Sequence, residues 1–334
     1  MHADLALPVR EPVPSVAEDP LLESAFEIPE PPSFMVRRPR LLAAVSGPTD
    51  LPITLVVGPA GSGKTQLVAS WVSEPSPDTV AWVTLDDVAG VGNFWAYVVE
   101  SLRRAGVPIS PSLTPPSPAV PVDRSFLVRL VTDLVKQRTP VVLVLDGVSA
   151  LTGQQWATDI EFVLRHTNPT LRLVLIGRWD PPVPLHRYRL AGRLTEVRSE
   201  QLAFTSEEAA QLLTLHGVDL SADGLSSLLD HTEGWAAGLR LFAMALQDHR
   251  DADRLVETIT GNEATIAEYF VDEVLRVQPP HVRTFLLETS ILDTFTPELA
   301  EAVTGRADAR AMLLELERHN AFVRPAAEFS VAYR

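Results

Sequence analysis

The segment at residues 58–65, GPAGSGKT, carries the residue types most able to do chemistry, because it fits the pattern G-x-x-x-x-G-K-[ST]. Glycines let such a loop adopt backbone angles at which successive N–H groups converge on phosphates. Lys64 would supply positive charge to the β- and γ-phosphates, and Thr65 would offer its hydroxyl to Mg²⁺. A strand-like run at 53–57 precedes the loop and a helical pattern at 64–73 follows it, as the motif requires. The predicted nucleotide-binding residues here are Gly58, Pro59, Ala60, Gly61, Ser62, Gly63, Lys64, Thr65 and Gln66.

A second candidate, Asp146, ends the apolar run VVLVLD. A carboxylate at the end of a buried parallel strand beside the loop strand can orient Mg²⁺ and its waters. The alternative is that Asp146 only caps a turn. ATPases built for turnover usually place a second acid directly after this Asp, but Gly147 stands there. Asp86 or Asp87 could substitute as the catalytic acid, although a solvated turn is the simpler interpretation. The sequence thus predicts an intact binding site with weakened hydrolysis.

A third candidate, Arg178, follows the strand-like run at 171–177, where a guanidinium could sense a γ-phosphate. An arginine in such a place is usually only a surface charge. The eight histidines show no ligand spacing, so no protein-held metal beyond nucleotide-bound Mg²⁺ is expected. We interpret Trp235 as a packing residue.

Composition limits the class of protein. The chain has 334 residues, 46% hydrophobic residues and no cysteine, and it has no apolar run long enough to cross a membrane. No signal peptide opens it, so a cytoplasmic location is expected. The net charge of −15 makes the chain a poor candidate for gripping DNA by itself.

The order of patterns predicts several domains. Four strand-like runs, at 53–57, 79–85, 141–146 and 171–177, alternate with helical patterns. This alternation predicts an α/β fold, a P-loop NTPase with a parallel sheet covered by helices on both faces. After residue 204 the patterns are helical, and the last unit reads as three helices followed by a hairpin, the order of a winged helix. The expected divisions are a disordered proline-rich acidic tail (1–33), a P-loop domain (34–204), an all-α domain (205–262) and a winged-helix-like domain (263–334).

With these motifs in order, the chain resembles the nucleotide-switch core of the MalT-like branch of the large LuxR-type transcription regulators, which are STAND-class signalling ATPases. VRRPRL resembles a family segment that lies against adenine, which implies contacts from Val36 and Arg38. GRWDPPVPLHRYRLAGRLTEV resembles the family's sensor segment and implies that Arg178 senses the γ-phosphate. TEGWAAGLRL, at 232–241, resembles the hinge that leads into the helical domain.

Three departures from the family pattern affect what is expected. Gly147 replaces the family's second acid, and Ala236 replaces the proline often found in the hinge. The sequence also stops inside the expected winged-helix hairpin, so that domain is expected to be truncated. The inducer sensor and the DNA-binding helix-turn-helix domain of the family would follow it.

The resemblance implies an ATP- and ADP-controlled switch, with Mg²⁺, slow hydrolysis and self-association on activation. Nucleotide would be held between the nucleotide-binding and winged-helix domains. DNA binding is expected only from a C-terminal domain absent from this chain, and no membrane partner is expected. Two alternatives stay open: an active P-loop ATPase or kinase, and a non-catalytic truncated scaffold.

Overall fold

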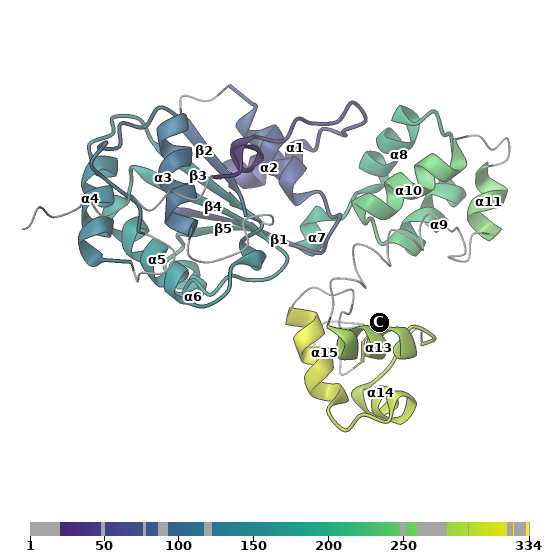
Figure 1. Ribbon diagram of the computed structural model, residues 1–334. Helices are drawn as coiled ribbons and strands as arrows, with labels where there is room; N and C mark the ends of the chain where they lie inside the picture. Colours follow the sequence, from purple (N-terminus) through teal and green to yellow (C-terminus); the bar gives the residue numbers. More distant parts are fainter. Residues whose placement is uncertain are drawn as a thin grey trace, which may run out of the picture.

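The computed structural model describes residues 21–47, 51–75, 78–85, 93–116, 122–247, 252–258, 279–292, 294–318, 323 and 332–333. Figure 1 shows a sheet wrapped by helices, a group of helices that follows it, and a third helical group near the C-terminus. No described helix is long and apolar enough to cross a membrane.

A five-stranded parallel sheet forms the centre of the first unit. Its strands are β1 Ile53–Val57, β2 Thr79–Thr84, β3 Val141–Asp146, β4 Leu171–Gly177 and β5 Leu194–Val197. The order across the sheet is β2-β3-β4-β1-β5. The four predicted strands are confirmed, and the short edge strand β5 is an addition because its half-exposed residues give only a weak apolar pattern.

The strand order corrects one prediction. The strand that ends at Asp146 was expected beside the strand of the phosphate loop, but β4 lies between β3 and β1. Alternation along the chain predicts parallel strands without fixing their order. Asp146 therefore lies two strands away from β1, which is about 10 Å at the usual strand spacing.

Helices cover both faces of this sheet, as predicted. Alternate strand residues face α3 Phe94–Arg104, α4 Arg124–Val135, α5 Gln155–Thr167 and α6 Leu185–Leu190 on one side. The opposite face packs against α1 Pro39–Ser46, α2 Lys64–Val72 and the short α7 Ser199–Leu202. Strands β1, β3 and β4 are buried on both sides, which explains why they read as continuous apolar runs.

The second unit is helical, with α8 Ser206–Leu215, α9 Ala222–Thr232, α10 Ala236–Leu246 and α11 Ala252–Thr258. The capping box at the start of α8 has both of its hydrogen bonds: the Glu208 N–H donates to Thr205 Oγ1 (3.3 Å) and the Thr205 N–H to Glu208 Oε2 (3.1 Å). Val36, from the segment before α1, is buried in the core of these helices. The segment therefore joins the two units.

The third unit contains α13 Pro280–Thr289, α14 Pro297–Thr304 and α15 Ala309–Arg318 around a small apolar core. Phe295 and Tyr333 form an antiparallel bridge. Its predicted first helix lies outside the described residues, as does most of the predicted hairpin.

The predicted disordered tail differs from the structure where it is described. Residues 1–20 lie outside the described residues. The 3-10 helix Glu23–Phe26 then places Ala25 in the core of the sheet domain. The Leu22 N–H donates to Tyr97 Oη (3.0 Å), and the Phe26 ring stacks on the Tyr97 ring at 5.5 Å. The proline-rich composition of this segment indicated disorder, and its few apolar residues gave no periodic pattern from which these contacts could be predicted.

Candidate functional site

The phosphate loop connects β1 to α2 in the conformation that its motif requires. Gly61 and Gly63 have φ of 68° and 83°, in the left-handed region that favours glycine, and α2 begins at Lys64. Lys64 Nζ donates to the carbonyl of Pro59 at 2.7 Å, and so does Ser62 Oγ at 2.8 Å. The loop thus holds the lysine ammonium group over its own backbone at the N-terminus of a helix, which is a favourable place for an anion.

The other polar candidates lie at the same edge of the sheet. Val57, the last residue of β1, pairs with Gly177 in β4, and the next residue is Arg178. Asp146 pairs with Ile176 and is buried. The backbone N–H of Arg178 donates to Ser149 Oγ (2.7 Å). The carboxyl ends of the strands thus bring the loop, Asp146 and Arg178 to one edge. Asp86 and Asp87 lie outside the described residues.

Gly147 has φ of 80°, so the position after Asp146 is also left-handed. A side chain there would strain the backbone by about 1–2 kcal/mol. The backbone at this position therefore favours glycine over the acidic residue that the family has there.

A cavity of about 1050 Å³ lies beside the loop. The segment at 30–38 forms one wall, Gly61, Gly63 and helix α2 form another, and helix α10 contributes a third. Of the predicted base-contacting residues, Val36 and Arg38 both line it. Gln66 lines it as well, and its Oε1 is buried with no hydrogen-bond partner. The cavity therefore lies between the sheet domain and the helical unit.

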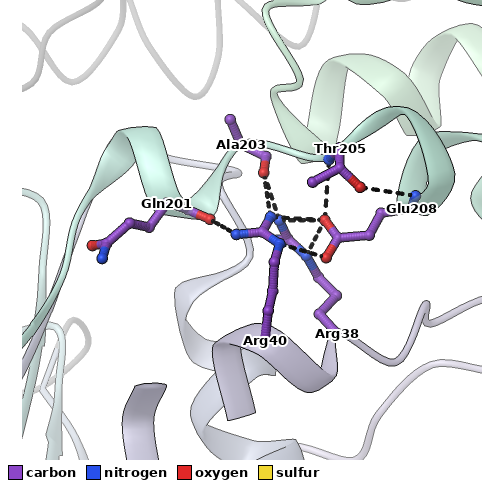
Figure 2. Close-up of polar contacts among 6 residues, drawn as sticks. All are labelled: Arg38, Arg40, Gln201, Ala203, Thr205 and Glu208. Atoms are coloured by element: carbon purple, nitrogen blue, oxygen red, sulfur yellow. Dashed lines mark hydrogen bonds and ion pairs between the residues drawn. The ribbon is translucent and has the colours of Figure 1, made fainter. Parts of the chain in front are cut away.

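The guanidinium of Arg38 makes its hydrogen bonds at the junction of these two units, as Figure 2 shows. Its Nε donates to Glu208 Oε2 at 2.9 Å and its Nη2 to the Ala203 carbonyl at 2.8 Å. Arg40 donates to both Glu208 oxygens, each at 2.8 Å, and to the carbonyls of Gln201 and Ala203. One carboxylate thus binds two arginines from the segment around the start of α1.

Electrostatics fix the charge state of this cluster. Burial opposes ionisation of Glu208, but hydrogen bonds from Arg40, Arg38 and the Thr205 N–H outweigh it and hold the pKa of Glu208 below its ordinary value. Burial lowers the pKa of Arg38, and its hydrogen bond to Glu208 acts in the opposite direction. Glu208 is therefore an ionised carboxylate at neutral pH, where it accepts the hydrogen bonds of the buried Arg38 guanidinium.

Sequence reasoning missed three contributors to this region. Arg40 and Glu208 are far apart along the chain, and the one sequence signal for Glu208 is its capping-box spacing, three residues after Thr205. Trp235, interpreted as a packing residue, also donates its indole N–H to the carbonyl of Ala60 in the phosphate loop at 2.8 Å. Its position in the hinge-like segment was the one available signal.

Comparisons with known proteins agree with this architecture. Residues 50–179 match a family described as an AAA domain, and residues 271–334 match the MalT winged helix domain. The chain is 32% identical over 295 residues to the HTH-type transcriptional regulator MalT of Serratia proteamaculans, covering 86% of this chain and 32% of the relative. It is 30% identical over 313 residues to the MalT of Klebsiella pneumoniae, covering 91% of this chain and 34% of that protein. The chain thus spans about a third of the length of these curated relatives.

Among solved structures, the Orc1 protein of Aeropyrum pernix in complex with DNA aligns over 90% of this chain and 89% of its own, with 16% identity and a TM-score of 0.43. At that distance nothing about function follows. The sequence relatives and the two matched domains confirm the predicted resemblance: the chain is MalT-like, with an AAA-type P-loop domain followed by helices and a MalT-type winged helix domain.

Proposed function

We propose that this chain is the nucleotide-controlled switch of a MalT-like transcriptional regulator, in which ATP and ADP set different conformations and hydrolysis is slow. The observation that carries the proposal is the cavity beside the phosphate loop, because both the sheet domain and helix α10 line it. A ligand in such a place contacts two units at once and can bias how they sit together.

The phosphate side of the site fits a nucleotide by the chemistry of its donors. The left-handed Gly61 and Gly63 open the loop, and Lys64 and the N-terminus of α2 favour negative charge there. Thr65 and Asp146 are the residues that would hold Mg²⁺. When bound, the ion neutralises phosphate charge. Arg178, one residue beyond the strand next to the loop, is proposed to sense the γ-phosphate.

The base side of the site fits as well. A volume of about 1050 Å³ accommodates a nucleoside, since ligand pockets usually measure about 300–1,000 Å³. Val36 and Arg38 line the wall where adenine is proposed to lie. The buried Gln66 Oε1 has no partner and can accept a hydrogen bond from an amino group. We therefore propose that nucleotide lies beside the helical unit, whereas the resemblance implies a position between the sheet and winged-helix domains.

In the intact regulator, self-association on activation is part of this proposal. The relatives are named HTH-type transcriptional regulators, and we propose that DNA contact comes from a helix-turn-helix domain. The acidic balance of this chain, −15, supports that division of roles.

The test is to purify the chain, release and identify bound nucleotide, and time single-turnover hydrolysis of added ATP. We expect the purified chain to retain ADP or ATP, and a single turnover of ATP to take minutes or longer. Lys64→Ala should abolish retention and leave the fold intact, whereas Lys136→Ala should change neither. Lys136 is the matched control because it is the other of the two lysines, it directly follows helix α4, and its side chain is 65% exposed. Unchanged ATP affinity in Lys64→Ala would refute the site.

The competing enzyme function makes the opposite prediction for the same experiment. An active P-loop ATPase or kinase would hydrolyse or transfer the γ-phosphate within seconds. Rapid turnover would indicate that another acid, such as Asp86, replaces the one missing at Gly147, and it would overturn the slow-switch proposal.

A further inference from the structure

The carbonyl groups of the phosphate loop are bound by two different parts of the chain. The carbonyl of Pro59 accepts hydrogen bonds from within the loop, from Lys64 and Ser62. The next two carbonyls instead accept from the helical unit. Ala60 accepts from the Trp235 indole N–H at 2.8 Å, and Gly61 accepts from the backbone N–H of Ala237 at 3.0 Å. Both donors lie at the start of α10.

Trp235 is held firmly in this position. Its backbone N–H donates to the carbonyl of Thr232 at 2.8 Å, and the preceding Gly234 carbonyl accepts from the Phe204 N–H at 2.8 Å. Its ring packs closely over Gly238, where an added Cβ would lie 2.7 Å from the ring atom Cε3. The indole N–H is thus directed at the loop by contacts on both sides of the residue.

The hydrogen bond to Ala60 has a geometric consequence for phosphate binding. The carbonyl of Ala60 and the N–H of Gly61 belong to one planar peptide group and point in opposite directions. A donor that fixes the carbonyl therefore also fixes the direction of the Gly61 N–H. Gly61 lines the cavity and has a left-handed φ. Because glycine has no Cβ, its φ is less restricted than that of other residues, so the orientation of this peptide group benefits from being fixed by a donor.

We propose that Trp235 is a positioning residue for the phosphate loop. Its indole N–H holds the Ala60–Gly61 peptide in the orientation in which the Gly61 N–H receives phosphate, and the backbone N–H of Ala237 binds the next carbonyl, that of Gly61. Nucleotide affinity then depends on α10 being seated on the loop. By linkage, nucleotide binding stabilises that seating by the same factor. The inference deepens the proposed function and rests on it.

Trp235→Phe tests this role because it keeps an aromatic ring and removes the donor. Affinity for a fluorescent ADP should weaken about two- to tenfold, the range expected for one net hydrogen bond. Trp71→Phe is the matched control. Trp71 lies in the last turn of α2, with its ring centre 5.0 Å from the guanidinium carbon of Arg172, and the ADP affinity of this variant should stay within twofold of the wild type. Melting temperatures without nucleotide show whether each variant is folded.

Hydrogen exchange gives a readout that a merely structural role would not move. In the wild-type chain, ADP should slow exchange of the amides at the start of α10, and Trp235→Phe should reduce that protection. Because the wild-type part of this measurement needs no variant, it stands even where Trp235→Phe does not fold. An unchanged affinity in Trp235→Phe, or no ADP-dependent protection in the wild type, would overturn the inference. A wild-type chain that binds no nucleotide would overturn the proposed function as well.

Discussion

Replacing Glu208 by glutamine should destabilise the junction between the sheet domain and the helical unit, which meet at the cavity. Arg38 is only 7% exposed, and its Nε lies 2.9 Å from the Glu208 carboxylate. Removing one partner of a buried ion pair costs about 3–5 kcal/mol, because the other charge stays buried and uncompensated. Arg40, whose side chain is 38% exposed, adds less than about 1 kcal/mol. Glutamine keeps one acceptor oxygen, so we expect a loss near 3 kcal/mol.

Urea unfolding followed by tryptophan fluorescence measures this loss, with Glu207→Gln as the control on the same helical turn. Glu207 is exposed, and its substitution should leave the unfolding midpoint close to that of the wild type. If the free energy of unfolding of Glu208→Gln at pH 7 lies within about 0.5 kcal/mol of the wild-type value, the electrostatic role assigned to the junction is refuted. Surface substitutions usually change stability by no more than about 0.5 kcal/mol, which sets this threshold.

The pH dependence gives an independent check. The pKa of Glu208 is lower in the folded chain than the ordinary glutamate value of 4.5, because Arg40, Arg38 and the Thr205 N–H donate hydrogen bonds to the carboxylate. The stabilisation is therefore fully present above pH 4.5 and is lost as the pH falls through the lower folded-state pKa. Because glutamine does not titrate, the difference between wild type and Glu208→Gln should shrink below pH 4.5. A difference that grows on acidification would contradict the sign.

Two further substitutions test the hinge before α10. Gly234→Ala should lower the free energy of unfolding by at least about 2 kcal/mol, because φ is 71° and the new Cβ would lie 2.8 Å from backbone atoms of Phe204. Gly217 is the control, since it has the same φ and no atom within 4 Å of an added Cβ. Gly217→Ala should cost only about 1 kcal/mol in the same urea unfolding assay. Ala236→Pro, which introduces the family's proline at the first position of a helix, should stabilise the chain by up to about 1 kcal/mol in the same assay. Equal costs for the two glycines, or a destabilised proline variant, would contradict this description of the segment before α10.

Local sequence patterns predicted the parts of the fold that depend on local physics. The apolar runs that became β1, β3 and β4 are buried on both faces and needed no long-range information. The phosphate loop was predictable because its glycines and Lys64 act within eight residues. The capping box of α8 was predictable for the same reason.

The missed features depend on contacts between distant residues. The order of β3 and β4 follows from packing across the whole sheet. The arginines that bind Glu208 are about 170 residues away from it, and Trp235 is 175 residues away from the carbonyl it binds. The helical and strand periodicities of the sequence do not predict contacts between residues so far apart in the chain. The resemblance drew attention to residues 232–241 without indicating that the tryptophan there donates to the loop.

The central claim is that ATP and ADP stabilise different conformations of one site shared by two units. Hydrogen exchange compared between the ADP-bound chain and the chain bound to a non-hydrolysable ATP analogue tests it most directly. We predict different protection at α10 and at the junction formed by residues 201–208 in the two states. Identical protection, with both nucleotides bound, would contradict the claim, because a ligand pair that binds both conformations equally shifts nothing.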